Sequence, residues 1–189
     1  MNASSQLELR VRRLEDRQAI ADLVAAYCFA VDDRDIERLA MLFTRGGRFR
    51  SDDGVLDARG REAVIEQFHA RFAVLGPSHH VTHDHMVRFD PQNPDMALGH
   101  LSSHAEVVRN GRSLIAALRY RDRYEREQDE WRFADRLLSF LYYVPAEEYA
   151  EALASPTRMR VYEEAGAADW PEGLESWQAY YGLKPEDGA

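Results

Sequence analysis

Residues 105–121, AEVVRNGRSLIAALRYR, set the fold class. An Asn-Gly pair stands in the middle of this stretch, between two runs whose apolar residues recur with a strand-like period of two. Such a pair is a strong signal for a tight hairpin turn. Similar runs continue on both sides and are separated by turn residues such as those at 90–94. The sequence therefore predicts a series of long antiparallel strands at 79–89, 97–108, 113–127 and 131–143.

The chain before these strands has a helical period instead. Apolar residues recur at three- and four-residue spacing over 14–31, and shorter helical patterns follow over 36–43, with Asp35 as the expected N-cap, and over 61–74. Residues 48–57 predict a short hairpin. Helices followed by long antiparallel strands predict an α+β fold, a curved sheet with helices packed against one face.

Composition limits the functional classes. The chain has 189 residues, 45% apolar and 11% aromatic, with 24 Lys plus Arg against 33 Asp plus Glu, a net charge of −9. This favours one folded domain and disfavours a general nucleic-acid binder, which needs a basic surface. No apolar run approaches a membrane span of about 18 residues. The single Cys28 excludes an intrachain disulfide. We expect a cytoplasmic protein with neither nucleic-acid nor membrane partners, since the N-terminus lacks a secretory signal.

We assign residues 1–145 to this domain and residues 146–189 to a C-terminal extension. A short helix is predicted over 146–153. The segment after it is interrupted by Pro and Gly and rich in aromatic residues, so we expect it to wrap the domain or a neighbouring subunit. We accordingly expect a homo-oligomer, a dimer or a trimer.

Four of the seven histidines lie within residues 78–85, SHHVTHDH. Side chains alternate between the faces of a strand, so His80 is expected on one face and His79, His83 and His85 on the other. His80 could act as a general base, because an unperturbed imidazole takes up a proton near neutral pH. His83 and His85 could instead bind a metal, or the histidines could be ordinary surface residues.

Three further groups of polar residues are candidates for a site. Asp32 ends the apolar face of the first helix, where an inward carboxylate would need a partner such as an imidazole from the sheet. Alternation places Tyr120, Asp122 and Tyr124 on one face of their strand, which could line a cavity. Arg136 lies on the last strand and, if buried, requires an acid or a ligand.

Together these stretches resemble the nuclear-transport-factor-2-like superfamily and, within it, the SnoaL-like cyclases and dehydratases. The resemblance spans about residues 8–143. It rests on LEDRQAI followed by Tyr27 and Asp32, on GREAV and HHVT, and on the strands from 119 to 136. It implies a cone-shaped half-barrel, a strongly curved, mostly antiparallel sheet with about three N-terminal helices packed on it, enclosing a pocket.

Scytalone dehydratase, bile-acid 7α-dehydratase and hexachlorocyclohexane dehydrochlorinase carry an aspartate and a catalytic histidine where Asp32 and His80 stand. The resemblance further implies functional roles for Tyr27 and Arg136. Residues expected to line the substrate pocket are Tyr120, Asp122, Tyr124, His104 and Phe49. One departure concerns residues 104–107, where some relatives have a third catalytic group. Regular alternation places Ala105 or Val107 there, and only a bulge would turn His104 or Glu106 inward.

The leading interpretation is a lyase or isomerase that needs no cofactor or metal. His80 would abstract a proton from a hydrophobic cyclic small molecule, such as a polyketide, a steroid or an aromatic-degradation intermediate, while Asp32 orients its ring. One alternative is a non-catalytic binding or oligomerisation module, like the small subunit of ring-hydroxylating dioxygenases; it predicts no contact between Asp32 and His80. The other is the metal site at His83 and His85.

Overall fold

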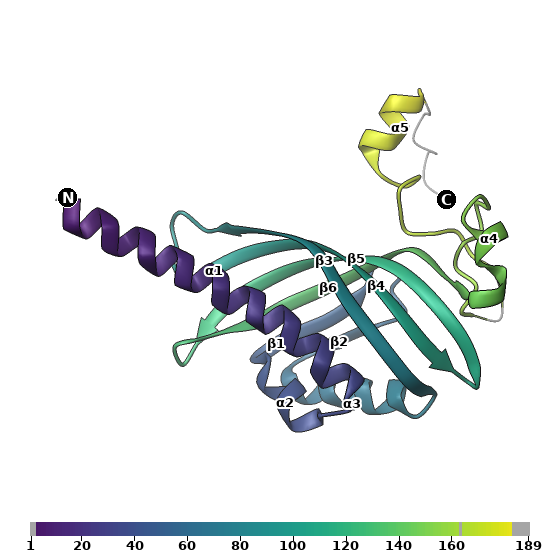
Figure 1. Ribbon diagram of the computed structural model, residues 1–189, viewed down its shortest axis with the longest axis horizontal. Coiled ribbons are helices and arrows are strands. Elements are labelled where there is room, and N and C mark those ends of the chain that lie inside the picture. Colours follow the sequence, from purple (N-terminus) through teal and green to yellow (C-terminus); the bar gives the residue numbers. More distant parts are fainter. Residues whose placement is uncertain (1–2, 163, 183–189) are drawn as a thin grey trace.

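The computed structural model describes residues 3–162 and 164–182, and its elements are shown in Figure 1. They are α1 (Ala3–Asp32), α2 (Ile36–Met41), β1 (Phe43–Ser51), β2 (Asp57–Arg59), α3 (Arg61–Phe72), β3 (Leu75–Phe89), β4 (Met96–Arg109), β5 (Arg112–Glu127), β6 (Glu130–Pro145), the 3-10 turn η1 (Ala146–Glu148), α4 (Tyr149–Ala152) and α5 (Glu175–Tyr181).

The strands form one curved, unclosed sheet in the order β2-β1-β6-β5-β4-β3. All pairings are antiparallel except that of β1 with β6, which is parallel. Asn110 and Gly111 form the β4–β5 turn with positive φ angles of 49° and 76°, as a tight hairpin with an Asn-Gly pair requires. The predicted α+β fold, a mostly antiparallel curved sheet with three N-terminal helices, is confirmed.

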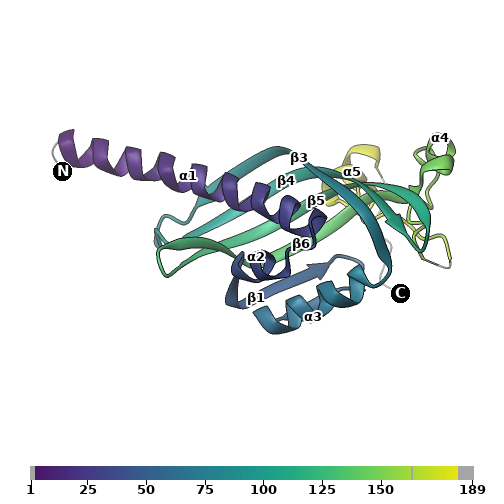
Figure 2. The same cartoon turned by 60° about the horizontal axis from the view of Figure 1, so that its bottom comes forward.

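The helices cover one side of the sheet, with α1 lying along β3 and α3 against β1 (Figure 2). The buried face of α1 includes Ile20, Val24, Tyr27 and Val31, which are at most 3% exposed. Their spacing of three, four and seven residues places them on one stripe of the helix. This packing closes the concave side of the sheet around an aromatic core.

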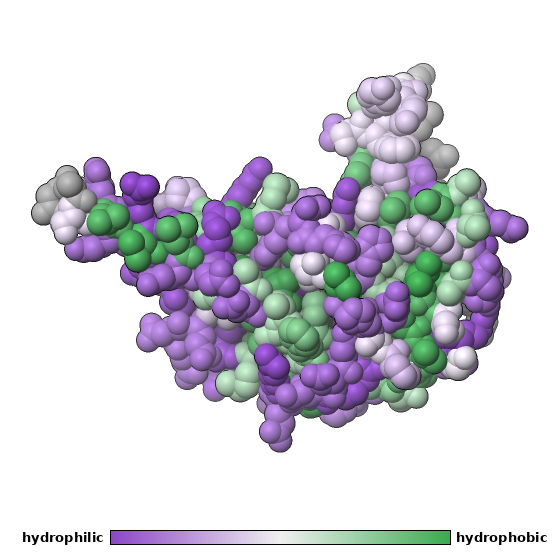
Figure 3. Space-filling view, viewed as in Figure 1, coloured by the Kyte–Doolittle hydropathy of each residue, from purple (hydrophilic) through white to green (hydrophobic). Residues whose placement is uncertain are grey.

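The first helix extends eleven residues beyond the predicted start at residue 14. Its N-terminal half projects past the sheet and leaves apolar side chains exposed, including Leu7, Leu9 and Leu14 (Figure 3). Helical propensity, rather than a buried face, accounts for this part of α1. That is why periodicity did not predict it.

The chain after β6 returns along that strand. Met159 pairs with Tyr143, and Asp169 accepts a hydrogen bond from the Phe140 N–H at 2.6 Å. The predicted helix over 146–153 is instead η1 followed by α4. Helix α5 stands clear of the sheet, with Tyr180 83% exposed, so its aromatic residues do not cover the domain (Figure 1).

The proposed division at residue 145 stays a prediction, and residues 183–189 of the predicted extension lie outside the described residues. In the part of the chain that the structure describes, each helix is either too short or too polar to cross a bilayer.

Candidate active site

Asp32 and His80 meet where the C-terminal end of α1 reaches the beginning of β3. The Nδ1 atom of His80 lies 2.6 Å from Oδ1 of Asp32, and the backbone N–H of His80 donates to Oδ2 at 2.8 Å. Both side chains are largely buried: that of His80 is 10% exposed and that of Asp32 is 15% exposed. The carboxylate is thus held in a fixed plane by two atoms of the same residue.

The environment of Asp32 favours its ionised form. Burial raises the pKa of its carboxyl, but hydrogen bonds from the His80 ring, from the His80 backbone and from Ser78 Oγ, at 2.8 Å, outweigh it, so the net pKa is lowered. An ionised carboxylate can only accept a hydrogen bond, so the neutral ring carries its hydrogen on Nδ1 and donates it to Asp32. His80 therefore keeps the lone pair of Nε2 free for a substrate proton.

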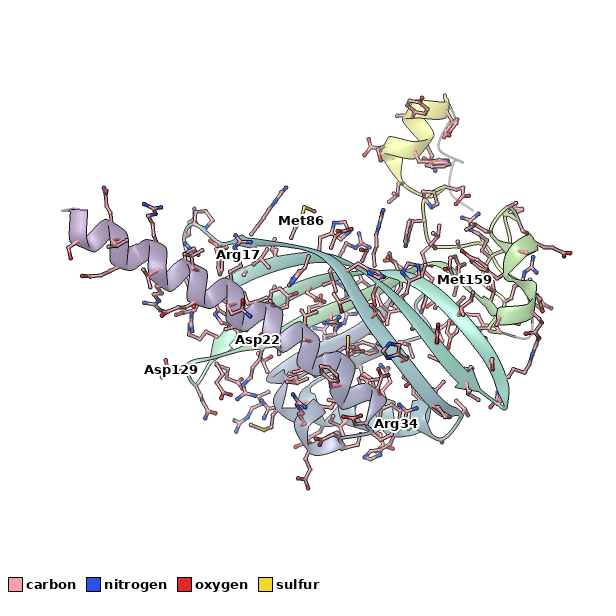
Figure 4. All side chains as sticks on the ribbon, viewed as in Figure 1. Arg17, Asp22, Arg34, Met86, Asp129 and Met159 are labelled. Atoms are coloured by element: carbon pink, nitrogen blue, oxygen red, sulfur yellow. The ribbon has the colours of Figure 1, made fainter. Side chains whose placement is uncertain are left out.

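Arg34 fixes the end of α1 to β3 (Figure 4). Its backbone adopts a left-handed φ of 61°, a conformation that costs a non-glycine residue about 1–3 kcal/mol. Its guanidinium donates to the carbonyls of Val31 and Gly76 and, at 2.9 Å, to Ser78 Oγ. Since Ser78 in turn donates to Asp32, this arginine supports the carboxylate indirectly. Sequence reasoning missed Ser78, although it lies on the same strand face as His80.

A narrow cavity opens beside His80. Its empty volume is about 500 Å³, and it is partly open to solvent. The lining is otherwise mostly apolar and consists of Tyr27, Val31, Arg71, Phe72, Leu75, His80, Ala105, Val107, Ala116, Leu118, Tyr120, Leu138, Phe140 and Tyr143. The cavity therefore combines one candidate base with an apolar wall, and a ring-sized ligand requires side chains at its mouth to move.

Tyr27 and Tyr120 supply the polar groups on the wall deeper in the cavity. Neither hydroxyl makes a hydrogen bond to another described residue. Burial raises the pKa of both phenols, and the nearby Arg136 charge only partly offsets this, so both remain protonated at neutral pH. Two buried O–H donors are thus available to an oxygen atom inside the cavity.

A charged network lies beneath these tyrosines. Arg136 is fully buried, with its guanidinium 4.1 Å from the ring centre of Tyr27 and 3.8 Å from that of Tyr120. Its Nη1 donates to Asp122 Oδ2 at 3.2 Å, and the Tyr124 hydroxyl donates to the same oxygen at 2.8 Å. Burial raises the pKa of Asp122 to about 6, although the Arg136 charge opposes the shift.

This arrangement refines the predicted roles. The structure brings His80, Tyr27 and Tyr120 together in the lining of the cavity, while Asp32 contacts His80 without lining the cavity itself. Other predicted residues also lie outside the lining: Asp122, Tyr124 and Arg136 form the layer below, and Phe49 is buried in the core. Arg136 contacts the lining residues Tyr27 and Tyr120.

The prediction that His104 lines the pocket is wrong. Strand β4 alternates regularly, so Ala105 and Val107 face the cavity while His104 and Glu106 are exposed on the opposite side. The ring of His104 instead accepts or donates a hydrogen bond with His83 at 2.8 Å on that outer face. The bulge that would turn His104 inward is absent from β4.

A bulge occurs instead in β3, between Thr82 and His85. It reverses the alternation, so His85 faces the interior, where its Nε2 lies 3.1 Å from the Tyr124 hydroxyl. The expectation that His83 and His85 share a face is therefore wrong, and they cannot chelate one metal ion together. Among residues 3–162 and 164–182, no group of three or more His, Cys, Asp or Glu side chains is arranged to hold a metal.

The SnoaL-like domain family matches residues 12–137, which contain Asp32, His80 and both cavity tyrosines, Tyr27 and Tyr120. The chain belongs to this family. No curated protein matches it.

Three similar solved structures show the same SnoaL-like architecture. A hexachlorocyclohexane dehydrochlorinase, LinA type 2, is 21% identical over 87% of this chain and 99% of its own, with a TM-score of 0.66. A candidate scytalone dehydratase from Novosphingobium aromaticivorans is 16% identical over 84% and 96%, with a TM-score of 0.68. A candidate aromatic ring hydroxylase from the same organism is 26% identical over 73% and 98%, with a TM-score of 0.64.

Proposed function

We propose that this SnoaL-like protein is a lyase or isomerase that acts on an apolar cyclic small molecule by proton abstraction, with His80 as the base. The observation that carries the proposal is the 2.6 Å contact between Asp32 and His80 Nδ1 at the wall of a largely apolar cavity. A carboxylate in that position fixes the tautomer and stabilises the imidazolium that forms when Nε2 takes up a proton.

In a dehydration, Nε2 removes a proton from the carbon next to the one that bears the leaving hydroxyl. The C–H electron pair forms the new double bond while the C–O bond breaks. The hydroxyl accepts the proton back from the His80 imidazolium and departs as water, which restores the neutral ring. The balance needs no oxidant or reductant.

Tyr27 and Tyr120 would stabilise the negative charge that develops on a substrate oxygen. Their hydroxyls are free of other described partners and are held in place by contact with the Arg136 guanidinium. Donors that are already oriented in a low-dielectric cavity stabilise developing charge without reorganisation. Arg136 is therefore a positioning residue in this proposal.

The contact between Asp32 and His80 also favours an enzyme over a binding module. A module that only binds needs no imidazole with a fixed tautomer, and that alternative predicted no such contact. An orienting carboxylate, a free Nε2 and two unpaired hydroxyls at one cavity are the components of acid–base chemistry. The substrate classes suggested by related proteins, polyketides, steroids and products of aromatic degradation, set the compounds to test.

The test is a screen of cyclic alcohols and ketones for dehydration or double-bond shift, followed by comparison of two histidine variants. His80→Ala should lower kcat about 10²–10⁴-fold, the usual contribution of general base catalysis. His79→Ala is the matched control because His79 precedes it on the same strand and is exposed. Equal activity of both variants and the wild type on a turned-over compound would refute the role of His80.

A further inference from the structure

A second, wider chamber adjoins the cavity beside His80. Its empty volume is about 950 Å³, against about 500 Å³ for the inner cavity. Arg71, Phe140 and Tyr143 line both spaces, so the two adjoin across these three side chains. The chamber's other walls come from α3, from the β1–β2 connection and, through Val161 and Tyr162, from the segment after β6.

Two arginines line this outer chamber without an acidic partner. Arg71 and Arg109 are both half-buried, and neither guanidinium makes an ion pair or hydrogen bond with any described residue. The lining residues include neither Asp nor Glu. This is unusual in a chain of net charge −9, in which many other arginines are paired with carboxylates.

One carboxylate, that of Asp53, contacts residues that line the outer chamber, and it already accepts three hydrogen bonds. Asp53 accepts hydrogen bonds from Ser51 Oγ, from the Val55 N–H at 3.0 Å and from the Tyr162 hydroxyl at 2.7 Å. Ser51, Val55 and Tyr162 line the chamber, whereas Asp53 itself does not, and its carboxylate is bonded to these three residues rather than to either arginine. The positive charge of the arginines is therefore left for a ligand.

The charges of both guanidiniums act on the Tyr143 hydroxyl. Burial raises the pKa of this tyrosine, while the charges of Arg71 and Arg109 each act to lower it. Its ring stacks on Phe140, at 5.3 Å between centres, and its hydroxyl has no hydrogen-bond partner among the described residues. Arg71 is also positioned by the rings of Phe49 and Phe68, each about 5.5 Å from its guanidinium carbon.

We propose that the outer chamber binds a carboxylate of the ligand between Arg71 and Arg109, with the Tyr143 hydroxyl as a third donor. The ligand is thus an apolar cyclic carboxylic acid whose carboxylate stays in the outer chamber while its ring extends past Phe140 towards His80. Planar guanidinium groups match the geometry of carboxylates, and charge-assisted hydrogen bonds are stronger than neutral ones. This inference rests on the proposed function, because it takes the inner cavity as the reaction site.

The experiment compares 2-naphthoate with 2-naphthamide, which has nearly the same shape but no charge, by isothermal titration calorimetry. The wild type should bind the naphthoate at least about tenfold more tightly, because hydrogen bonds to charged groups are stronger than those between neutral groups. Arg71→Gln and Arg109→Gln should each reduce this preference. Arg10→Gln changes the net charge equally on the exposed face of α1 and should leave it unchanged. Thermal melts establish that each variant is folded.

Equal affinities for the two compounds, no binding of either, or a preference that survives both arginine substitutions would overturn the proposal. His80→Gln separates it from the proposed function, because this variant lacks the base yet should retain the preference for naphthoate. A catalytically inactive wild type that prefers naphthoate would refute the function and support the binding site. A wild type that turns over neutral compounds but shows no preference for naphthoate would support the proposed function and refute the carboxylate site.

Discussion

His80 Nδ1 and Asp32 Oδ1 lie 2.6 Å apart although 48 positions separate the two residues in the chain. The contact forms because the amphipathic face of α1 docks along β3 and brings the helix end to the strand. Asp32 is the last residue of α1, so this docking places its carboxylate directly against the imidazole of His80. The orientation of the imidazole therefore depends on the packing of α1 against β3.

Asp32→Asn should lower kcat about 10²–10⁴-fold on any compound that the protein turns over. The amide preserves the shape of the side chain but removes the charge that stabilises the imidazolium. Asp33→Asn is the control, because Asp33 is adjacent and exposed. Steady-state kinetics of both variants decide the matter, and an Asp32→Asn enzyme with wild-type kcat would contradict the dyad.

The same aspartate should make stability depend on pH. Burial raises the pKa of Asp32, but the hydrogen bonds to its carboxylate lower the pKa by a larger amount, so the folded protein favours the ionised form. A depressed carboxyl pKa stabilises the fold above the unfolded value of about 3.9, and this contribution disappears as the pH falls through the folded value. In urea unfolding, the difference in free energy between the wild type and Asp32→Asn should be smaller at pH 3 than at pH 5. A difference that grows on acidification would contradict this sign.

Gly99→Ala should destabilise the fold by about 1–3 kcal/mol, the usual range for overpacking a core. A Cβ atom at this position would overlap the Tyr124 ring and its hydroxyl oxygen. The ring would have to move and release its hydrogen bond to Asp122. Urea denaturation should show a smaller loss for Gly99→Ala in a Tyr124→Leu background than in the wild type. Strictly additive losses would show that the two residues do not compete for space.

Asp122→Asn should destabilise the protein by about 3–5 kcal/mol at pH 8, because it leaves the Arg136 charge buried without a counter-charge. At that pH the Asp122 carboxyl, with its pKa of about 6, is ionised. Replacing both partners, as Asp122→Asn with Arg136→Met, should recover much of the loss. Chemical denaturation of the two variants measures the difference, and a double variant less stable than the single one would refute an isolated pair.

The sequence predicted the contact between Asp32 and His80 and the strand faces where the alternation is regular. Tyr120, Asp122 and Tyr124 all face inward, as period-two alternation requires. It failed where a single extra residue interrupts a strand, as at His85, because a bulge leaves no reliable mark in one sequence. The burial of Arg136 and the placement of Arg71 and Arg109 in the lining of one chamber depend on packing between distant segments, which periodicity does not describe.

The bulge in β3 also bears on which changes of length this strand tolerates. After it the odd-numbered residues, such as Val87, face the interior, because the strand carries one extra position between Thr82 and His85. Deletion of one residue there would remove the bulge and restore regular pairing with β4, so Val87 would still face inward, and His80, which precedes the bulge, would keep its place. The strand can therefore lose its extra residue without exchanging its two faces, and the exposed connection between β3 and β4 is likewise free to grow or shrink.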